Sequence, residues 1–491
     1  MNELRGVNIE SRIRYACIAC RAPLVHRNDS RLTCQSCQAE FPVVHGIPIL
    51  APRPRALLQS HVENLQSAER HASKLESNLA AHSSARAERA VRGIRANLQL
   101  AQRYLKPVVD YLSSAEVGTP HLNDWISSRN AGWPLHEMLP YFVQDWLPSR
   151  DFRRGSALIV DALATHRPDA KTLAVFGAGA CGLVKECAPQ FDEVHAIEMS
   201  VPTVFIAQGV LAGDSIDVHL QSSGWRGVTV GGPQTPLKNI HLTVADASCL
   251  PFEAGSLSAV VTQYLMDIVA NPLGVAAEIS DALKPGGIWI NFSIPFPLPG
   301  EPKELSRPTL EDLPSLLQTL QFQLISGRRE KFALLDPADI DPGAAFVTDE
   351  VHFFVARKTS DSGRTVTHRE RRFDWQSVPR PVPGREVSII LRTVLTSADR
   401  SEQREISVSG GSRTFPLGAD QSHLISALLS AFDGQRTLRD IFETLQNGSY
   451  PLDVENFKEL MFYLTERYGI FTTTPEESST HAERSATVLP R

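Results

Sequence analysis

Short apolar runs alternate with polar and glycine-rich segments through the central part of this 491-residue chain. Short runs of this kind, bounded by turn residues, predict buried strands, and the segments between them carry helical spacing. We expect strands at 172–176, 193–197, 240–245, 257–261 and 288–290. Because strands that alternate with helices form parallel sheets, the pattern predicts an α/β fold.

The first of these strands ends in a glycine-rich turn, and a helix is expected to begin near Leu183. Glycines allow a tight turn and a close approach of a ligand to the backbone, while the free N–H groups of the helix start face that ligand. The turn therefore predicts a nucleotide site, with binding residues Gly177, Ala178, Gly179 and Gly182.

Two acidic residues follow later strands. Glu198 comes 19 residues after Gly179, where it can accept hydrogen bonds from both ribose hydroxyls of an adenosine ligand. Asp246 directly follows the strand at 240–245 and is placed to accept a hydrogen bond from the exocyclic amine of adenine. A nicotinamide-dependent dehydrogenase shares the glycine pattern and is the first alternative.

The order of these signals, closed by Leu283-Lys284-Pro285-Gly286-Gly287 before another strand, resembles the class I S-adenosylmethionine-dependent methyltransferases over residues 140–358. The resemblance implies a Rossmann-like, seven-stranded core and S-adenosylmethionine as cofactor. It also places Asp246, Ala247 and Gln263 beside that cofactor. Since Asp246-Ala247 and the lysine-proline-glycine-glycine segment belong to the methyltransferase pattern, the dehydrogenase is disfavoured.

Three segments resemble the N2227-like family, which includes carnosine N-methyltransferase: Phe142-Val143-Gln144-Asp145-Trp146, Trp289-Ile290-Asn291-Phe292 and Glu304-Leu305-Ser306. The resemblance implies methylation of nitrogen on a peptide-like acceptor. Residues 262–267 depart from that family's pattern, which indicates a diverged substrate site.

Methyl transfer from a sulfonium is an in-line displacement, so the protein has to hold the nucleophile on axis and manage its proton. Class I enzymes place substrate-facing side chains after the fourth strand. Asp267 could orient or deprotonate an acceptor nitrogen, and Gln263 and Asn291 could accept its hydrogen bonds. We therefore predict catalytic roles for Asp267, Tyr264, Gln263 and Asn291, with a purely structural role as the alternative for each.

Two CxxC knuckles lie near the N-terminus, with 13 residues between them. This spacing lets two turns present four thiolates tetrahedrally, and it predicts a structural Zn²⁺ bound by Cys17, Cys20, Cys34 and Cys37. With four sulfur ligands no position remains for an activated water. The segment 41–50 resembles the strand after the second knuckle in Trm112-like ribbons attached to methyltransferases. Some relatives modify RNA, but residues 1–50 hold only six Arg against four acids, so RNA binding stays an unsupported alternative.

The C-terminal part is expected to form a separate module with a helical core from Leu428, Leu429, Phe432, Leu438, Ile441 and Phe442. Residues 428–445 and 464–471 resemble the PqqD-like winged-helix modules, which implies peptide binding along a sheet edge or dimerisation. A DNA-binding winged helix is the rival. The helix expected at 454–468 carries three Glu against one Lys and one Arg, which disfavours DNA.

Composition and charge exclude little. The net charge of −6 gives no general attraction to nucleic acid or anionic membrane. Residues 1–14 lack the apolar core of a signal peptide, and the chain has no long apolar run, so we expect no membrane partner and a cytoplasmic location.

We expect six regions: a zinc ribbon (1–52), a helical bridge (53–139), the methyltransferase core (140–358), a linker (359–384), the winged-helix module (385–474) and a disordered tail (475–491). The function expected is S-adenosylmethionine-dependent N-methylation of a peptide or peptide-like small molecule, with a peptide or protein partner possible at the C-terminal module. The alternatives are an RNA methyltransferase and a non-catalytic, cofactor-binding scaffold that recruits peptides.

Overall fold

The computed structural model describes residues 15–80, 84–114, 135–147, 150–166, 171–221, 224–269, 271–296, 307–334, 347–359, 375–381, 387–395, 400–408, 414–417, 419–448, 452–462, 464 and 471–472. The Glu304-Leu305-Ser306 element and the tail predicted at 475–491 lie outside these residues. Within the described part of the chain, no helix combines the length and the apolar character needed to cross a membrane.

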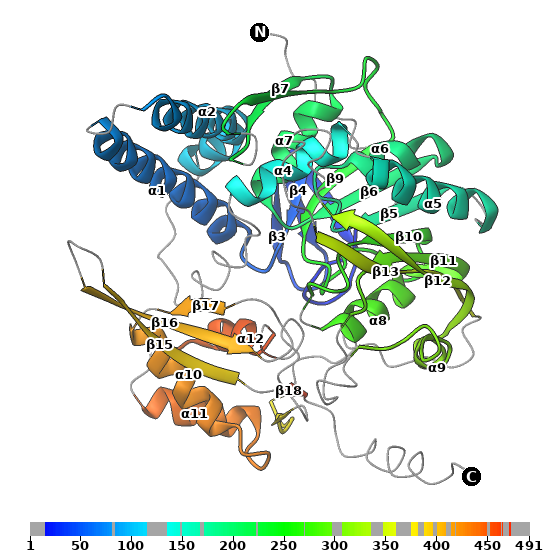
Figure 1. Cartoon of the computed structure of the whole chain (residues 1–491). Coiled ribbons are helices and arrows are strands. Elements are labelled where there is room, and N and C mark those ends of the chain that lie inside the picture. The colour runs from blue at the N-terminus through cyan, green and yellow to red at the C-terminus, as the bar shows by residue number, and fades with distance from the viewer. Residues whose placement is uncertain are drawn as a thin grey trace, which may run out of the picture.

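One large sheet forms the centre of the molecule (Figure 1). Its core strands, in spatial order, are β9 (Ile240–Ala245), β6 (Glu193–Glu198), β5 (Thr172–Phe176), β10 (Leu257–Gln263), β11 (Leu283–Ser293), β13 (Val347–Lys358) and β12 (Phe322–Leu334). The first five strands are parallel, and β13 is antiparallel to both of its neighbours. This arrangement confirms the seven-stranded, Rossmann-like α/β core.

The sheet is buried on both faces. Along β5, Leu173 and Val175 belong to one hydrophobic cluster and Ala174 and Phe176 to the other, as the alternation of side chains in a strand requires. The first cluster includes residues of α4 (Leu135–Trp146), α5 (Arg150–His166), α6 (Gly182–Cys187) and α7 (Val201–Leu211). The second includes residues of α8 (Pro272–Ala282) and α9 (Leu313–Thr319). A single 3-10 turn, η1 (Ala188–Gln190), follows α6.

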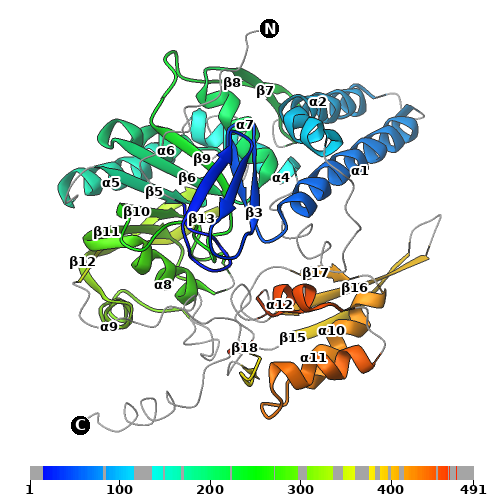
Figure 2. The ribbon, with the colours of Figure 1, turned by 180° about the vertical axis from the view of Figure 1, so that it is seen from behind.

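The N-terminal ribbon continues this sheet. It consists of β1 (Leu24–Asn28), β2 (Arg31–Cys34), β3 (Glu40–Val44) and β4 (Ile47–Leu50), and β4 pairs in parallel with β9. Figure 2 shows these strands beside the core. The ribbon covers the edge of β9, which would otherwise expose unpaired backbone groups.

Two long helices follow the ribbon, α1 (Pro54–Ala80) and α2 (Ala85–Ser114), as the helical spacing predicts. The helix α2 packs against a hairpin inserted between α7 and β9, which consists of β7 (Ser215–His219) and β8 (Gly227–Gly231). Asn97 donates to the His219 carbonyl at 2.7 Å and accepts from its N–H at 3.0 Å. The Tyr104 hydroxyl donates to Asp214 at 2.7 Å. These bonds fix the helical bridge to the core.

The C-terminal elements have a core of their own. They are β14 (Arg380–Pro381), β15 (Val387–Leu395), β16 (Arg400–Val408), β17 (Thr414–Leu417), α10 (Ala419–Ala431), α11 (Leu438–Asn447), α12 (Val454–Phe462) and β18 (Phe471–Thr472). Thr437 and Asp440 form a capping box at the start of α11.

The C-terminal end of the segment predicted as a linker, 359–384, packs against the C-terminal elements. Trp375 packs against Phe457 with ring centroids 5.8 Å apart, and β14 pairs with β18. The large apolar ring of Trp375 gives residues 375–381 a place in the module, although the proline content of the segment suggested a connection without structure of its own.

Candidate functional site

The glycine turn lies where β5 ends and α6 begins, at the carboxyl edge of the parallel sheet. Gly177 and Gly179 have φ values of 65° and 53°, in the left-handed region that favours glycine. Among the residues that the structure describes, a Cβ built on Gly179 would meet only the Gly177 carbonyl oxygen, at 4.0 Å. These residues leave the space over Gly179 open, and a ligand could approach the backbone there.

Glu198 reaches the glycine turn from the end of β6. One carboxylate oxygen accepts from the Gly179 N–H at 3.0 Å, and the other accepts from the N–H groups of Met199 and Ser200, both at 2.8 Å. The structure thus brings Glu198 and the turn together, as the 19-residue spacing predicts. The bonds fix the direction of a carboxylate that stays half-buried.

Asp246 directly follows β9, next to β6 in the sheet. Its carboxylate accepts from the Ser248 N–H at 2.9 Å, which holds the side chain in a local turn, and the following Ala247 is buried. Because the carboxyl ends of neighbouring parallel strands meet at one edge, Asp246, Glu198 and the glycine turn lie along the same rim.

Tyr264 stands at the end of β10 in an unusual backbone conformation. Its φ is 47°, and its N–H donates to the Phe292 carbonyl at 2.8 Å. The ring of Tyr264 packs edge-on against Phe292, with centroids 5.4 Å apart. A left-handed tyrosine costs about 1 to 3 kcal/mol, and such strain is concentrated at functional sites. The preceding Gln263 is half-buried at the same strand end.

Asp267 is oriented by a neighbouring strand. The Ser293 hydroxyl, at the end of β11, donates to the Asp267 carboxylate at 2.6 Å. Asp267 is half-buried, and the bond from Ser293 gives its carboxylate a fixed direction. Such a group can accept a proton or orient an N–H donor.

Asn291 lies inside the sheet rather than at its rim. It is fully buried; its side-chain oxygen accepts from Thr262 at 2.9 Å and its amide donates to the His352 carbonyl at 3.3 Å. The Trp289 indole donates to the same Thr262 hydroxyl at 3.0 Å. These bonds connect β10, β11 and β13, and they favour the structural alternative for Asn291.

Asp145 and Trp146 reach the glycine turn from the end of α4. In the sequence they stand out only as part of the segment 142–146, which resembles the N2227-like family. The Asp145 carboxylate accepts from the Gly182 N–H at 3.0 Å, and the Trp146 indole donates to the Ala180 carbonyl at 2.8 Å. Burial raises the pKa of Asp145 to about 7, against the opposite effects of the Gly182 N–H and Lys185. The only sequence signal for this contact is an acidic residue in an apolar helix before the turn.

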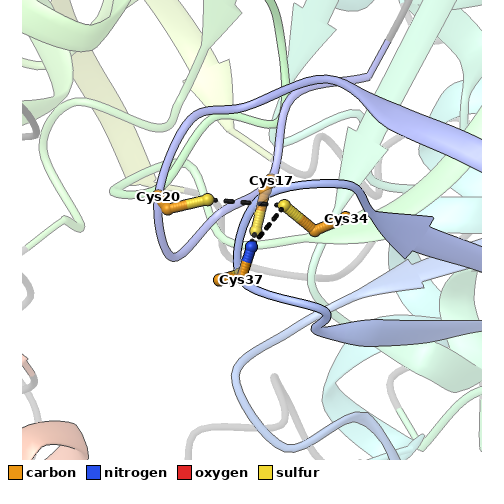
Figure 3. Close-up of side chains that lie close together, drawn as sticks. All are labelled: Cys17, Cys20, Cys34 and Cys37. Atoms are coloured by element: carbon orange, nitrogen blue, oxygen red, sulfur yellow. Dashed lines mark hydrogen bonds between the residues drawn. The ribbon is translucent and has the colours of Figure 1, made fainter.

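The four predicted metal ligands come together in the ribbon (Figure 3). Their sulfur atoms all lie within 4.8 Å of one another, with Cys17 and Cys37 at 3.6 Å and Cys20 and Cys34 at 3.4 Å. A tetrahedral zinc with Zn–S bonds of about 2.3 Å needs sulfurs about 3.8 Å apart. The donor set and its spacing therefore fit Zn²⁺.

The knuckles pack on the loop that follows Asp246. The Ala16 N–H donates to the Pro251 carbonyl at 3.0 Å, the Cys249 thiol lies 3.4 Å from the Ile18 carbonyl, and the Arg21 guanidinium donates to the Leu250 carbonyl. The ribbon and this loop share one hydrophobic cluster. The cysteine cluster is thereby joined to the loop that follows Asp246.

Residues 175–291 match the sequence profile of the family described as "Methyltransferase domain". A comparison with curated proteins found no match. The profile match includes the glycine turn, Glu198, Asp246 and the end of β10, so the chain contains a methyltransferase domain and is a methyl-transferring enzyme.

Several solved structures are similar to part of the chain. YcgJ of Bacillus subtilis is 15% identical with a TM-score of 0.30, covering 42% of this chain and 99% of that one. A chain in the complex of the Haloferax volcanii Trm112 methyltransferase activator is 14% identical with a TM-score of 0.30, covering 45% and 94%. The phosphoethanolamine N-methyltransferase 2 of Haemonchus contortus is 14% identical with a TM-score of 0.31, covering 45% and 57%. Likenesses this weak add nothing to the domain match.

Proposed function

We propose that this protein transfers a methyl group from S-adenosylmethionine to a nitrogen of a peptide or peptide-like molecule. The observation that carries the cofactor assignment is the rim itself: an open glycine turn, the Glu198 carboxylate held by the Gly179 N–H of that turn, and Asp246 after the next strand of the sheet. Glu198 would accept from the ribose hydroxyls, and Asp246 with Ala247 would hold the adenine.

When bound, S-adenosylmethionine supplies an electrophilic methyl group on a positively charged sulfur. The residues of the chain then have to position the acceptor and remove its proton. Asp267, oriented by Ser293, is the proposed proton acceptor. Tyr264 and Gln263, at the end of β10, would hold the acceptor nitrogen on the axis of transfer.

A peptide-like acceptor is supported by the resemblance to the carnosine N-methyltransferase family and by the C-terminal module. The sheet of that module has the order β15-β16-β17, and within the described residues the outer edge of β15 pairs with no other strand. An open edge of this kind can accept an extended peptide as a further strand. The PqqD-like assignment of the module remains part of this proposal.

The proposed role of Zn²⁺ is structural. Cys17, Cys20, Cys34 and Cys37 would fill all four positions of a tetrahedral ion, so the metal holds the two knuckles together and leaves no position for substrate.

A mass-spectrometric experiment tests the acceptor class. The zinc-quantified protein is incubated with isotopically labelled S-adenosylmethionine and, separately, with a peptide pool and an RNA pool. We expect labelled methyl groups on peptide nitrogen, lost in the Asp267→Asn variant. Labelled RNA would favour the RNA alternative, and cofactor binding without transfer to either pool would favour the scaffold.

A further inference from the structure

The end of α4 is fixed against the glycine turn by a close contact. A Cβ added to Gly182 would lie 2.5 Å from the Asp145 Cβ and 2.7 Å from its carbonyl oxygen. Glycine at this position is therefore required by the approach of Asp145. The hydrogen bond of Trp146 to Ala180 is buried and anchors the same helix end, so the Asp145 carboxylate has a defined place beside the turn.

Among the residues that the structure describes, this carboxylate forms no ion pair. Lys185, the cation that acts on it electrostatically, has its amine 2.9 Å from Glu186 and 5.1 Å from the Trp146 ring centroid. The Asp145 side chain is nevertheless half-buried rather than enclosed. A partly exposed, poorly solvated carboxylate can therefore accept a positively charged ligand group.

S-adenosylmethionine presents such a group. Its adenine amine and ribose hydroxyls are assigned to Asp246 and Glu198, which leaves the ammonium of its methionine part without a counter-charge. We infer that Asp145 binds this ammonium and so recognises the amino-acid end of the cofactor. The inference depends on the proposed function, because it takes S-adenosylmethionine as the ligand.

Asp145 could instead serve only as a cap for the start of α6. Cys181 occupies the N-cap position of that helix and makes no side-chain capping bond, so the Asp145 carboxylate replaces one. Asparagine can accept the same Gly182 N–H bond without the negative charge. Asp145→Asn therefore separates the two roles, because it keeps the cap and removes the counter-charge.

The experiment compares two ligands by calorimetric titration. S-adenosylhomocysteine carries the amino-acid end, whereas 5′-methylthioadenosine keeps the adenine, ribose and sulfur and lacks it. In Asp145→Asn we expect affinity for S-adenosylhomocysteine to fall about 10- to 100-fold, the loss of one charge-assisted hydrogen bond, with affinity for 5′-methylthioadenosine unchanged. Asp161→Asn, an exposed site on α5, serves as the matched control.

The same comparison in the wild-type protein needs no variant. Because the pKa of Asp145 is about 7, protonation removes the counter-charge below that pH. The preference for S-adenosylhomocysteine over 5′-methylthioadenosine should then fall several-fold as the pH is lowered from about 8 to about 6. An equal loss of affinity for both ligands in Asp145→Asn would overturn the inference. So would a preference for S-adenosylhomocysteine that is unchanged in the variant and across pH. Wild-type protein that binds neither ligand would overturn the proposed function, and the inference with it.

Discussion

At the scale of single residues, Asp267 is the proposed proton acceptor. Its carboxylate receives a hydrogen bond of 2.6 Å from Ser293, and the residue is half-buried. Replacing it with asparagine removes the proposed proton acceptor but preserves the shape and the Ser293 bond. We expect Asp267→Asn to lower kcat by about 10²- to 10⁴-fold with little change in S-adenosylhomocysteine affinity. Steady-state kinetics and calorimetry check this, with Asp161→Asn as control; retained turnover in Asp267→Asn would remove it from the mechanism.

Tyr264 gives a second test at this scale. Its ring packs on Phe292, so Tyr264→Phe removes only the hydroxyl and leaves that packing in place. If the hydroxyl positions the acceptor nitrogen, kcat should fall roughly 10- to 100-fold while the melting temperature stays unchanged. Tyr111→Phe on α2 provides the matched control. A Tyr264→Phe enzyme of normal activity would leave the strained backbone, rather than the hydroxyl, as the feature that matters.

The sequence predicts the position of a side chain well where its signal is local. Glu198 and Asp246 follow strands at fixed distances from the glycine turn, and the structure places both at the rim. Asp145 had no such signal, because its contact with Gly182 crosses 37 positions and depends on how α4 packs. Asn291 shows the converse: the sequence predicts it after the strand at 288–290, whereas β11 extends to Ser293 and Asn291 is bonded inside the sheet to Thr262 and the His352 carbonyl.

At the scale of elements, apolar runs predict the core strands because each is buried on both faces. The pairing of β4 with β9 cannot be predicted from apolar runs. The segment Ile47–Leu50 is apolar, which predicts a short buried strand but not which strand it pairs with. The strand that pairs with such a segment is determined by tertiary contacts, because one short apolar strand can fit the edges of many sheets.

The β6–β9 pair carries a pH-sensitive feature. His195 and His241 are cross-strand partners whose rings stack with centroids 5.1 Å apart, and Tyr15 and Phe252 meet the buried His195 edge-on. Burial lowers the pKa of both imidazoles, that of His241 from 6.5 to about 4, although Glu193 opposes the change. Between these values the unfolded chain binds more protons than the folded one, so folding stability falls as pH falls.

We therefore expect acid to weaken the protein through this pair. The free energy of unfolding should decrease between pH 6.5 and about 4, with His241 contributing on the order of 2 kcal/mol. His241→Phe keeps an aromatic ring and should flatten that part of the curve, measured by urea unfolding at several pH values. His26→Gln, which changes an exposed imidazole on β1, should follow the wild type. A His241→Phe curve as steep as the wild type would place the acid sensitivity elsewhere.

At the scale of the whole molecule, the ribbon and the methyltransferase core are one structural unit. They share a sheet through β4 and β9 and a hydrophobic cluster that joins Tyr15 and Leu32 to Phe252. The knuckle residues also contact the loop after Asp246 through Ala16, Ile18 and Arg21. We therefore expect that order imposed on the ribbon by a bound Zn²⁺ extends to the loop after Asp246, the residue proposed to bind adenine.

Zinc removal tests this coupling. Without the ion the four thiols no longer hold the knuckles, so the loop at 249–252 loses its partners and Asp246 its fixed position. We expect chelation, or Cys37→Ser, to lower the melting temperature by several degrees and to weaken S-adenosylhomocysteine binding about tenfold or more. Cys187 is buried and lies outside the cluster, so the Cys187→Ser variant should still bind zinc in the ribbon and serves as a control for the loss of a thiol. Zinc added back to the chelated protein should restore affinity, whereas unchanged affinity in the metal-free protein would show that the ribbon is only an attached module.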